Sequence, residues 1–291
     1  MERWREGRVA VPGGNVWYGV AGDGLPGVPL LVVHGGPGIS HDYLENLAVL
    51  GDERPVVFYD QLGSGRSDRP EATDLWTVER FVEELACLRR EAGLPEMHVL
   101  GQSWGAMLVA AYLAESREGV RSVIFSGPAL SASRFAADQE THVAVLPSAV
   151  RETLQRCRDQ EDYASDAYQN AMQVFYRRHV CRLDPWPEAL ERTFSAMNPT
   201  VYLYMWGPSE FDPLGTLRDA DYTSVLPTLR FPVLFTCGEF DEATPETTAY
   251  YCSQTPGAEM AVLEGTSHVH HLEAPEKFLA LVRAFLRRAE G

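Results

Sequence analysis

The stretch that decides the fold is VLGQSWGAMLVAA, from Val99 to Ala111, in which a single serine, Ser103, lies between two glycines. An apolar run typical of a buried strand precedes the serine, and a helix-forming run follows it. A strand–Gly-x-Ser-x-Gly–helix corner places the serine on a tight turn at the carboxyl edge of a parallel sheet. Gly101 and Gly105 let the strand and helix backbones pass close together. We therefore interpret Ser103 as a nucleophile; a structural turn serine is the alternative.

Strand and helix patterns alternate on both sides of this corner. Short β-branched or aromatic runs predict strands at 15–21, 29–35, 54–60, 97–103, 121–127, 231–241 and 259–265. Helical periodicity occupies 75–93, 104–116, 245–254 and 274–290. Several of the strand runs are apolar on both faces, as parallel strands covered by helices are. This alternation predicts an α/β fold with a mostly parallel sheet and helices on both of its faces.

The alternation is interrupted between about Leu130 and Leu214, where no strand is predicted. Helical stretches at 137–157, 161–181 and 187–197 occupy this region, with PWP and NPT as helix breakers. We predict that residues 130–214 form a helical cap inserted into a core made of residues 1–129 and 215–291. The chain length of 291 residues is near the upper limit for a single hydrophobic core, which agrees with one domain carrying an insertion.

Composition and charge restrict the classes of partner. The net charge of −16 argues against nucleic acid, because phosphate binding requires basic patches. No apolar run approaches the ~20 residues of a membrane span, and the charged N-terminal segment lacks the apolar stretch of a secretory signal. The five cysteines are irregularly spaced without a CxxC pair, which indicates reduced thiols in a cytoplasmic protein. The oligomeric state is not predicted.

A serine nucleophile needs a base that takes its proton and an acid that orients the base. In α/β-hydrolases these groups follow in the chain order Ser, Asp or Glu, His. Asp241 ends the strand run FPVLFTCGEFD, and His268 follows the last predicted strand in the segment GTSH. Both positions lie just past strand ends, at the edge where parallel sheets carry their sites. We therefore expect Ser103, Asp241 and His268 to form a catalytic triad.

Neighbouring residues remain alternatives in these roles. His270 and His271 could replace His268 as the base, and Glu239 or Glu242 could replace the acid at the preceding strand end. We prefer His268 because it directly follows the Gly-Thr-Ser loop.

The oxyanion needs two hydrogen-bond donors aimed at the developing charge. One is expected to be the backbone N–H of Trp104, directly after the nucleophile. The other is expected from the glycine-rich loop HGGPG at 34–38, which follows an early strand. Because His34 precedes the serine in the chain, we expect it to hold this loop rather than act as the base. Asp60 is likewise expected to bond the turn of YDQLGSGRSD.

Five motifs together resemble the prolyl aminopeptidases, also called proline iminopeptidases, and most closely the group that includes the tricorn-interacting aminopeptidase. They are HGGPG (34–38), YDQLGSGRSD (59–68), GQSWGA (101–106), GEFDEATPE (238–246) and GTSH (265–268). The resemblance spans the whole chain, and HGGPG with GQSWG is far more specific than Gly-x-Ser-x-Gly alone. Two departures, Ala106 in place of a glycine and Ser64 in place of a common cysteine, are not expected to affect catalysis.

The resemblance implies an α/β-hydrolase core with a helical cap, and a serine exopeptidase without metal or cofactor. It implies the same triad as above and an oxyanion hole made by Gly36 and Trp104. It also implies that Glu210 and Glu242 bind the free α-ammonium of the substrate. A carboxylate pair in a dry pocket suits that task, because an exopeptidase must bind the terminal charge.

The expected function is a serine hydrolase that releases an N-terminal amino acid, proline or a small apolar residue, from peptides or aminoacyl amides through an acyl-enzyme. The alternative function uses the same serine hydrolase reaction on a different substrate. It is an amino acid amidase, or a hydrolase that removes an aminoacyl group from a natural-product polyketide intermediate. The three triad residues argue against a non-hydrolytic binding module. Glu210 and Glu242 argue against a lipase or an esterase acting on an uncharged substrate. Which cap aromatics line the pocket is left open.

Overall fold

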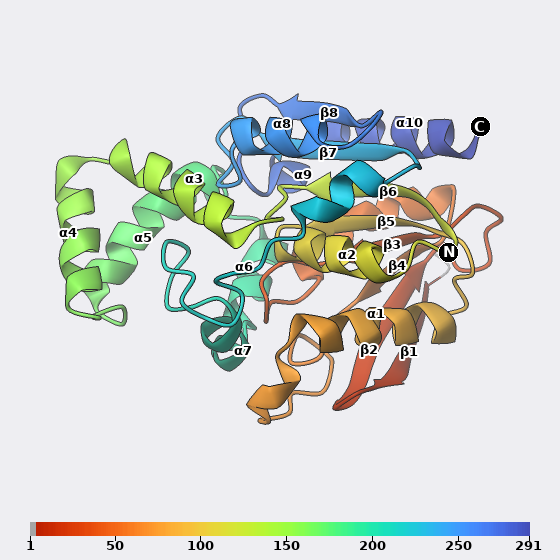
Figure 1. The fold of residues 1–291 in the computed structure, drawn as a ribbon, viewed down its shortest axis with the longest axis horizontal. Coiled ribbons are helices and arrows are strands. Elements are labelled where there is room, and N and C mark those ends of the chain that lie inside the picture. Colours follow the sequence, from red (N-terminus) through yellow and green to blue (C-terminus); the bar gives the residue numbers. More distant parts are fainter. Residues whose placement is uncertain (1–3) are drawn as a thin grey trace.

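A computed structural model describes residues 4–291 of the chain (Figure 1). Its described part contains one eight-stranded sheet with the strand order β1-β2-β4-β3-β5-β6-β7-β8. The strands are β1 (Trp4–Val11), β2 (Gly14–Ala21), β3 (Leu30–Val33), β4 (Val56–Tyr59), β5 (Met97–Gln102), β6 (Val120–Ser126), β7 (Val233–Gly238) and β8 (Glu259–Leu263). Strands β3 to β8 are parallel, whereas β1 and β2 are antiparallel to their neighbours. The predicted, mostly parallel sheet is confirmed.

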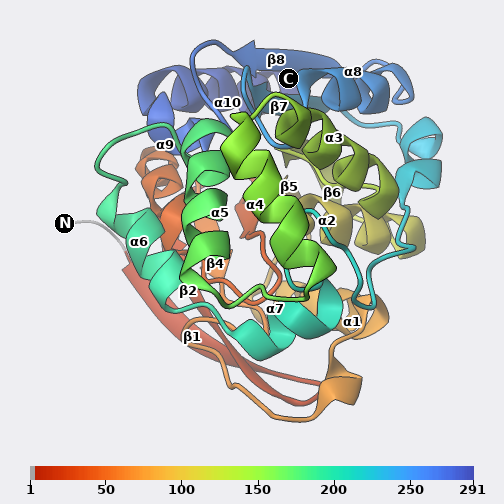
Figure 2. The same ribbon diagram turned by 90° about the vertical axis from the view of Figure 1, so that its left-hand side faces the viewer.

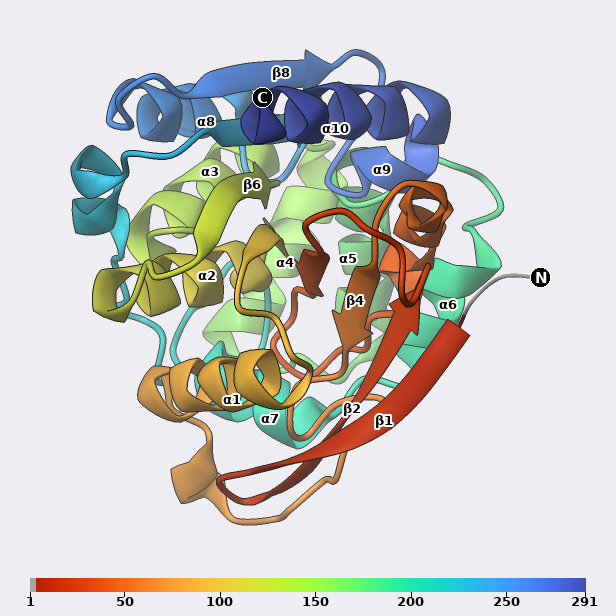
Figure 3. The same ribbon diagram turned by 90° about the vertical axis from the view of Figure 1, so that its right-hand side faces the viewer.

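The edge strand β1 is absent from the sequence prediction. It pairs with β2 along its full length, from Trp4 opposite Ala21 to Val11 opposite Gly14, and the two lie side by side at the edge of the sheet (Figure 3). Most of β1 is exposed and its sequence WREGRVAV is rich in charge, so its apolar alternation is weak. The signal that could have revealed it is the Pro-Gly turn before β2, where Gly13 has a φ of +96°.

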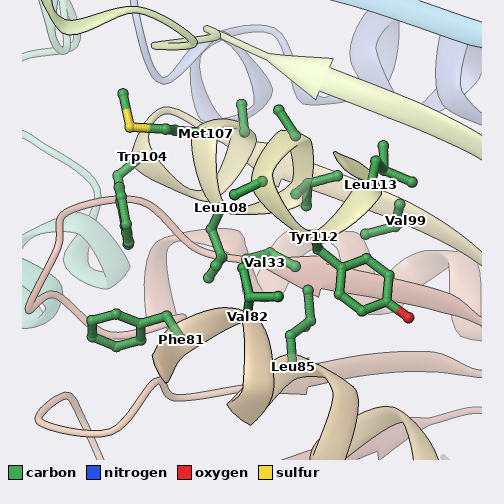
Figure 4. Close-up of a cluster of buried hydrophobic side chains, with 14 of the residues drawn as sticks. Val33, Phe81, Val82, Leu85, Val99, Trp104, Met107, Leu108, Tyr112 and Leu113 are labelled. Atoms are coloured by element: carbon green, nitrogen blue, oxygen red, sulfur yellow. The ribbon is translucent and has the colours of Figure 1, made fainter. Parts of the chain in front are cut away.

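Helices cover both faces of the sheet, as predicted. One buried cluster joins one face to α1 (Val78–Glu91), α2 (Trp104–Glu115), α8 (Pro245–Ser253) and the 3₁₀ helix η3 (Thr223–Thr228). A second cluster joins the other face to η1 (Asp42–Asp52) and α10 (Pro275–Glu290). Two short helices, η2 (Thr73–Leu75) and α9 (His270–Glu273), lie in the connections. Helix α2 is apolar on all sides because the sheet, α1 and η3 all pack against it, and Figure 4 shows its side chains beside Val33 of β3 and Leu85 of α1.

Five α-helices precede η3 in the segment between β6 and β7, and they gather on one side of the sheet (Figures 1 and 2). They are α3 (Ala132–Ala144), α4 (Ser148–Asp159), α5 (Asp166–His179), α6 (Glu188–Ser195) and α7 (Pro199–Met205). The single stretch predicted at 137–157 is wrong: Pro147 separates α3 from α4, because proline cannot continue a helix.

The prediction that NPT breaks a helix is incomplete, because this motif also starts α7. The Asn198 side chain accepts a hydrogen bond from Thr200 N at 3.1 Å, and Pro199 occupies the first helical position, where a missing N–H costs nothing.

Across residues 4–291, no helix combines the length and apolar composition that a membrane crossing requires.

Candidate active site

Ser103 occupies the sharp turn between β5 and α2. Its backbone has a φ of 56° and a ψ of −122°, a conformation that non-glycine residues rarely adopt. The two flanking glycines make this turn possible. A Cβ at Gly101 would lie 2.5 Å from the Gly105 carbonyl oxygen, and a Cβ at Gly105 would collide with the Val33 carbonyl oxygen. The predicted close approach of strand and helix is therefore confirmed, and it presents Ser103 at the carboxyl edge of the sheet.

Asp241 and His268 meet at this edge from the ends of β7 and β8. His268 Nδ1 lies 2.7 Å from Asp241 Oδ1, and both side chains are buried. Two backbone groups, Gly238 N–H and Ala243 N–H, also donate to the carboxylate at 3.0 and 2.9 Å. Burial opposes ionisation of Asp241, but attraction to His268 and the hydrogen bond from it, with a smaller contribution from His270, hold its pKa below the usual value. An ionised Asp241 fixes His268 with Nδ1 as the donor.

The alternative bases are engaged elsewhere. His270 Nε2 lies 3.0 Å from the hydroxyls of both Ser126 and Thr236. His271 Nε2 donates to the Tyr43 carbonyl oxygen at 3.0 Å, and burial lowers the pKa of His271 to about 3. Neither histidine lines a cavity that Ser103 lines.

Of the alternative acids, Glu239 accepts a hydrogen bond from Gly265 N–H at 2.8 Å and is exposed. Glu242 contacts His268 on the opposite ring nitrogen, at 3.2 Å between Oε1 and Nε2. Only Asp241 among the three therefore meets the nitrogen that an orienting acid must hold.

The nitrogen of His268 that faces the cavity has two partners in this structure, and neither is the serine. Besides Glu242 Oε1, Gln102 Nε2 lies 3.0 Å from His268 Nε2. Between the described side chains of Ser103 and His268 there is no hydrogen bond, although both line the same cavity. Nucleophile–base contacts are often long in ligand-free enzymes and tighten when substrate binds.

Gln102 belongs to a hydrogen-bond chain that sequence reasoning missed. Gly35 N–H donates to the Tyr43 hydroxyl at 2.8 Å, the Tyr43 hydroxyl donates to Gln102 Oε1, and the Gln102 amide then faces His268 Nε2. All of these side chains are buried. The only signal for Gln102 was its place in GQSWG, and Tyr43 carried none, because the contact joins residues 59 positions apart.

Two cavities open beside Ser103. The larger one, of about 240 Å³, is also lined by His268, Glu210 and Glu242. The smaller one, of about 20 Å³, is lined by Gly36, Ser103, Trp104, Met107, Ala129, Phe135, Trp206 and Glu210. A more open hollow of about 730 Å³ beside η1 shares none of these residues. The described residues contain no group of three His, Cys, Asp or Glu side chains placed to hold a metal ion.

The predicted oxyanion donors lie next to the nucleophile. Trp104 is the first residue of α2, and the first N–H groups of a helix have no acceptor within the helix. Gly36 has a φ of +108° and, like Ser103, lines both cavities. His34 holds the glycine-rich loop, as predicted: its Nδ1 lies 2.9 Å from the Gly35 carbonyl oxygen, and its Nε2 accepts from Gln61 N–H at 3.0 Å.

The turn after β4 supports this loop. Asp60 accepts hydrogen bonds from Arg66 N–H at 2.8 Å and from His41 N–H at 2.9 Å, so its expected structural role is confirmed. The Gln61 side chain accepts from the indole N–H of Trp104 at 2.9 Å. Hydrogen bonds from the turn after β4 thus hold the segments that carry the two candidate oxyanion donors.

Glu210 and Glu242 reach the larger cavity from different parts of the chain. Glu210 accepts a hydrogen bond from the Tyr202 hydroxyl at 2.6 Å. Glu242 is 4% exposed, and its Oε2 is buried with no hydrogen-bond partner. Burial raises the pKa of both carboxyl groups. Among residues 4–291, no Lys or Arg side chain lines this cavity, and His268 is the one basic side chain beside the two carboxyls there.

Comparisons with known proteins agree with this geometry. The sequence model of the alpha/beta hydrolase fold matches residues 28–275. The proline iminopeptidase of Heyndrickxia coagulans is 46% identical over 284 residues, which cover 97% of this chain and 99% of that protein. This chain belongs to the proline iminopeptidase family of α/β-hydrolases.

Two solved structures extend the similarity to three dimensions. The proline iminopeptidase of Mycobacterium smegmatis is 37% identical, with a TM-score of 0.91 and 98% of each chain covered. VinJ is also 37% identical, with a TM-score of 0.93 over 98% of this chain and 99% of that one. Membership of the family, the α/β-hydrolase fold and the nature of the protein as a hydrolase are therefore established.

Proposed function

We propose that this protein is a serine aminopeptidase that releases an N-terminal residue with a free amino group, with proline as the leading candidate. The observation that carries the proposal is the pair of carboxyl groups, half-buried Glu210 and buried Glu242, in the cavity that also holds Ser103 and His268. A cavity with two carboxyls and no lining Lys or Arg among the described residues suits a cationic ligand. The substrate's α-ammonium supplies that charge.

In the proposed reaction, Ser103 Oγ attacks the carbonyl carbon of the first residue while His268 Nε2 takes the hydroxyl proton. Asp241 keeps the imidazole in the required tautomer through the 2.7 Å contact. The N–H groups of Gly36 and Trp104 stabilise the developing oxyanion. His268 then gives its proton to the leaving amine, an acyl-enzyme remains, and water releases the amino acid.

The smaller cavity supports a small apolar first residue. Its wall beside Ser103 includes Met107, Ala129, Phe135 and Trp206, and its volume is only about 20 Å³. Because about 20 Å³ has room for little more than one water molecule, we propose that its apolar wall meets only the edge of the proline ring and that the rest of the ring lies in the larger cavity. Glu210 lies on the rim of both cavities, which suits an amino group next to that ring.

The proposal includes the cap and the location of the protein. Tyr176, Tyr202 and Glu210 line the larger cavity from the inserted segment, so we propose that residues 130–214 close over the site.

The five cysteines are free thiols, which supports a cytoplasmic location. The proposed partners are short peptides or aminoacyl amides.

The test is a kinetic panel of L-aminoacyl arylamides with and without an N-acetyl group. We expect the proline arylamide to be cleaved with the highest kcat/KM, the N-acetyl form to be inert, and Ser103→Ala to lose at least about 10³-fold in kcat, as removal of a triad member does. Unreduced turnover by Ser103→Ala would refute the proposal.

A second candidate is an amidase or aminoacyl hydrolase that acts on a longer molecule, as the sequence also allowed. The larger cavity favours it, because about 240 Å³ with Gln169 and Gln173 in its wall exceeds the needs of a single residue. Amino acid amides and long-chain aminoacyl amides in the same panel separate the two: a higher kcat/KM for the long amides would select the second.

A further inference from the structure

The nitrogen that must receive the Ser103 proton already has two other partners in this structure. His268 Nε2 lies 3.2 Å from Glu242 Oε1 and 3.0 Å from the Gln102 amide nitrogen. A neutral imidazole that donates Nδ1–H to Asp241 has a single acceptor, the lone pair on Nε2. In this geometry that lone pair is not available to the Ser103 hydroxyl.

The contact with Glu242 requires a proton between the two atoms. A carboxylate oxygen and an unprotonated ring nitrogen at 3.2 Å would repel each other in a buried site. Either an imidazolium N–H donates to Oε1, or a carboxylic O–H donates to Nε2. Both arrangements place one proton on the line from His268 Nε2 to Glu242 Oε1, and both block transfer from Ser103.

The charges around the pair indicate that this proton is retained near neutral pH. Burial alone would lower the pKa of His268, but Glu242 and Asp241 raise it to about 9. Burial also raises the pKa of Glu242 well above its usual value, and Glu210 adds to the effect. The two partners therefore hold one proton together at pH 7.

The other titratable groups packed around His268 are Glu210, Tyr176, Tyr202, His179, His270 and His271. Burial raises the pKa values of both tyrosines and lowers those of His179 and His271 to about 4 and 3, so these four are neutral at pH 7. His270 lies beyond Asp241, 3.6 Å from Oδ2. Apart from the proton shared by His268 and Glu242, positive charge that offsets the carboxyls in the cavity must therefore arrive with a ligand.

We propose that the substrate's own protonated amino group unmasks the base: it binds Glu242 and Glu210, displaces the proton that Glu242 shares with His268, and leaves Nε2 able to accept the Ser103 proton once the Ser103 hydroxyl replaces the Gln102 amide as its partner. Glu242 Oε2 has no hydrogen-bond partner in this structure, so it is available to accept a hydrogen bond from that amine. The released proton passes to solvent, and no bond to carbon changes in this step. The inference rests on the proposed function, because it takes Ser103 as the nucleophile and His268 as the base.

Amine recognition then acts on catalysis as well as on binding. A substrate without a free amino group binds more weakly, and it also meets a base that cannot accept a proton. Selectivity for free N-termini thus follows from one contact that serves two purposes. If Glu242 acted in binding alone, its replacement would raise KM and leave the reactivity of the base unchanged. The proposed role predicts that the reactivity of the base changes as well, and this difference can be measured.

The decisive experiment uses diisopropyl fluorophosphate, an uncharged electrophile that labels an activated serine. Its reaction depends on Ser103 and the base but not on binding of an amino group. We expect wild-type labelling to rise with pH to a midpoint near 9, the pKa of His268. In Glu242→Gln the midpoint falls by one unit or more, so labelling at pH 7 becomes about tenfold faster or more. Turnover of the proline arylamide by the same variant falls.

The matched control is Glu239→Gln, which removes the same charge from the same loop. Glu239 is exposed and accepts only from Gly265 N–H, a bond that a glutamine oxygen can keep. We expect its labelling midpoint to equal that of the wild type. Equal midpoints in wild type and Glu242→Gln would overturn the inference while leaving the proposed function intact. Absence of labelling at Ser103 in the wild type would instead overturn the proposed function.

A second measurement does not depend on any change at Glu242. Calorimetry of L-prolinamide binding to Ser103→Ala, in two buffers of different ionisation enthalpy, reports protons released on binding. We expect a release of about one proton or more per ligand at pH 7. Binding without proton release would overturn the inference.

Discussion

At the scale of the residue, the site depends on backbone positions that admit no side chain. Gly127 directly follows β6 and has a φ of +52°, and a Cβ there would lie 2.8 Å from His268 Nδ1 and 3.3 Å from Asp241 Oδ2. The contact between Asp241 and His268 therefore depends on a glycine that belongs to neither of their loops. The motifs of the sequence do not single out this residue.

We expect Gly127→Ala to lower kcat/KM by at least about tenfold, because the methyl group pushes the imidazole away from Asp241 and Ser103. The control is Gly257→Ala, at a φ of +72° with no atom within 4 Å of the added Cβ. That variant carries the same type of backbone strain, about 1–2 kcal/mol, and should keep its activity. Kinetics and thermal unfolding of both variants test this, and equal activity in the two would refute it.

At the scale of the element, two cap helices hold the loops that carry the site. His142 of α3 contacts the Asp241 carbonyl oxygen at 2.9 Å, and His179 of α5 contacts the Phe240 carbonyl oxygen at 2.9 Å. The backbone of His268 in turn donates to the His179 carbonyl oxygen at 3.0 Å. Helices α3 and α5 thus hold the backbone of Asp241 and His268 in place.

Asp138 of α3 offers a test of this support. It accepts hydrogen bonds from Thr244 Oγ1 at 3.0 Å and Thr247 Oγ1 at 2.8 Å, at the start of α8 and just after the loop with Asp241. We expect Asp138→Ala to lower the free energy of unfolding by about 1–3 kcal/mol, since two buried hydroxyls lose their acceptor. We also expect kcat/KM to fall.

The control on the same helix is Glu140→Ala. Glu140 forms an exposed ion pair with Arg158 at 3.1 Å, and exposed ion pairs contribute little to stability. Urea unfolding and kinetics of the two variants separate the contributions. A stability loss in Glu140→Ala as large as that in Asp138→Ala would contradict the expected role.

At the scale of the whole molecule, buried histidines make stability depend on pH. Burial lowers the pKa values of His34 and His179 to about 4 and of His271 to about 3, against about 6.5 in an unfolded chain. Between these values the unfolded state binds more protons, so acid favours unfolding. His268 has the opposite sign: its raised pKa stabilises the fold below about 6.5, and this contribution is lost as pH rises toward about 9.

We therefore expect the melting temperature to be highest near neutral pH, to fall steeply between about pH 6.5 and 4, and to fall more gently toward pH 9. Thermal unfolding across this range is the measurement. His179→Asn removes one of these three histidines and should flatten the acid limb. A melting temperature that stays constant from pH 7 to 4.5 would contradict this expectation.

Much of the core could be predicted because its signals are local. The run AMLVAAYLA is apolar on all sides and predicts a buried helix. The corner at Ser103 is predicted from its own two glycines and the apolar strand before it. Prediction failed where local signals were weak or had two meanings. The charged edge strand β1 shows little alternation, and the proline of NPT both ends one helix and starts α7.

The sequence by itself determined the fold class, the order of the serine, acid and base along the chain, and the motifs that mark the family. These follow from patterns a few residues long, which set backbone geometry directly. Tertiary structure alone decided which side chain meets which ring nitrogen. Glu239 and Glu242 are three residues apart in one loop, yet only Glu242 contacts His268 Nε2. The physical reason is that such contacts depend on how β7, β8 and the cap helices pack against one another, and no local pattern encodes this.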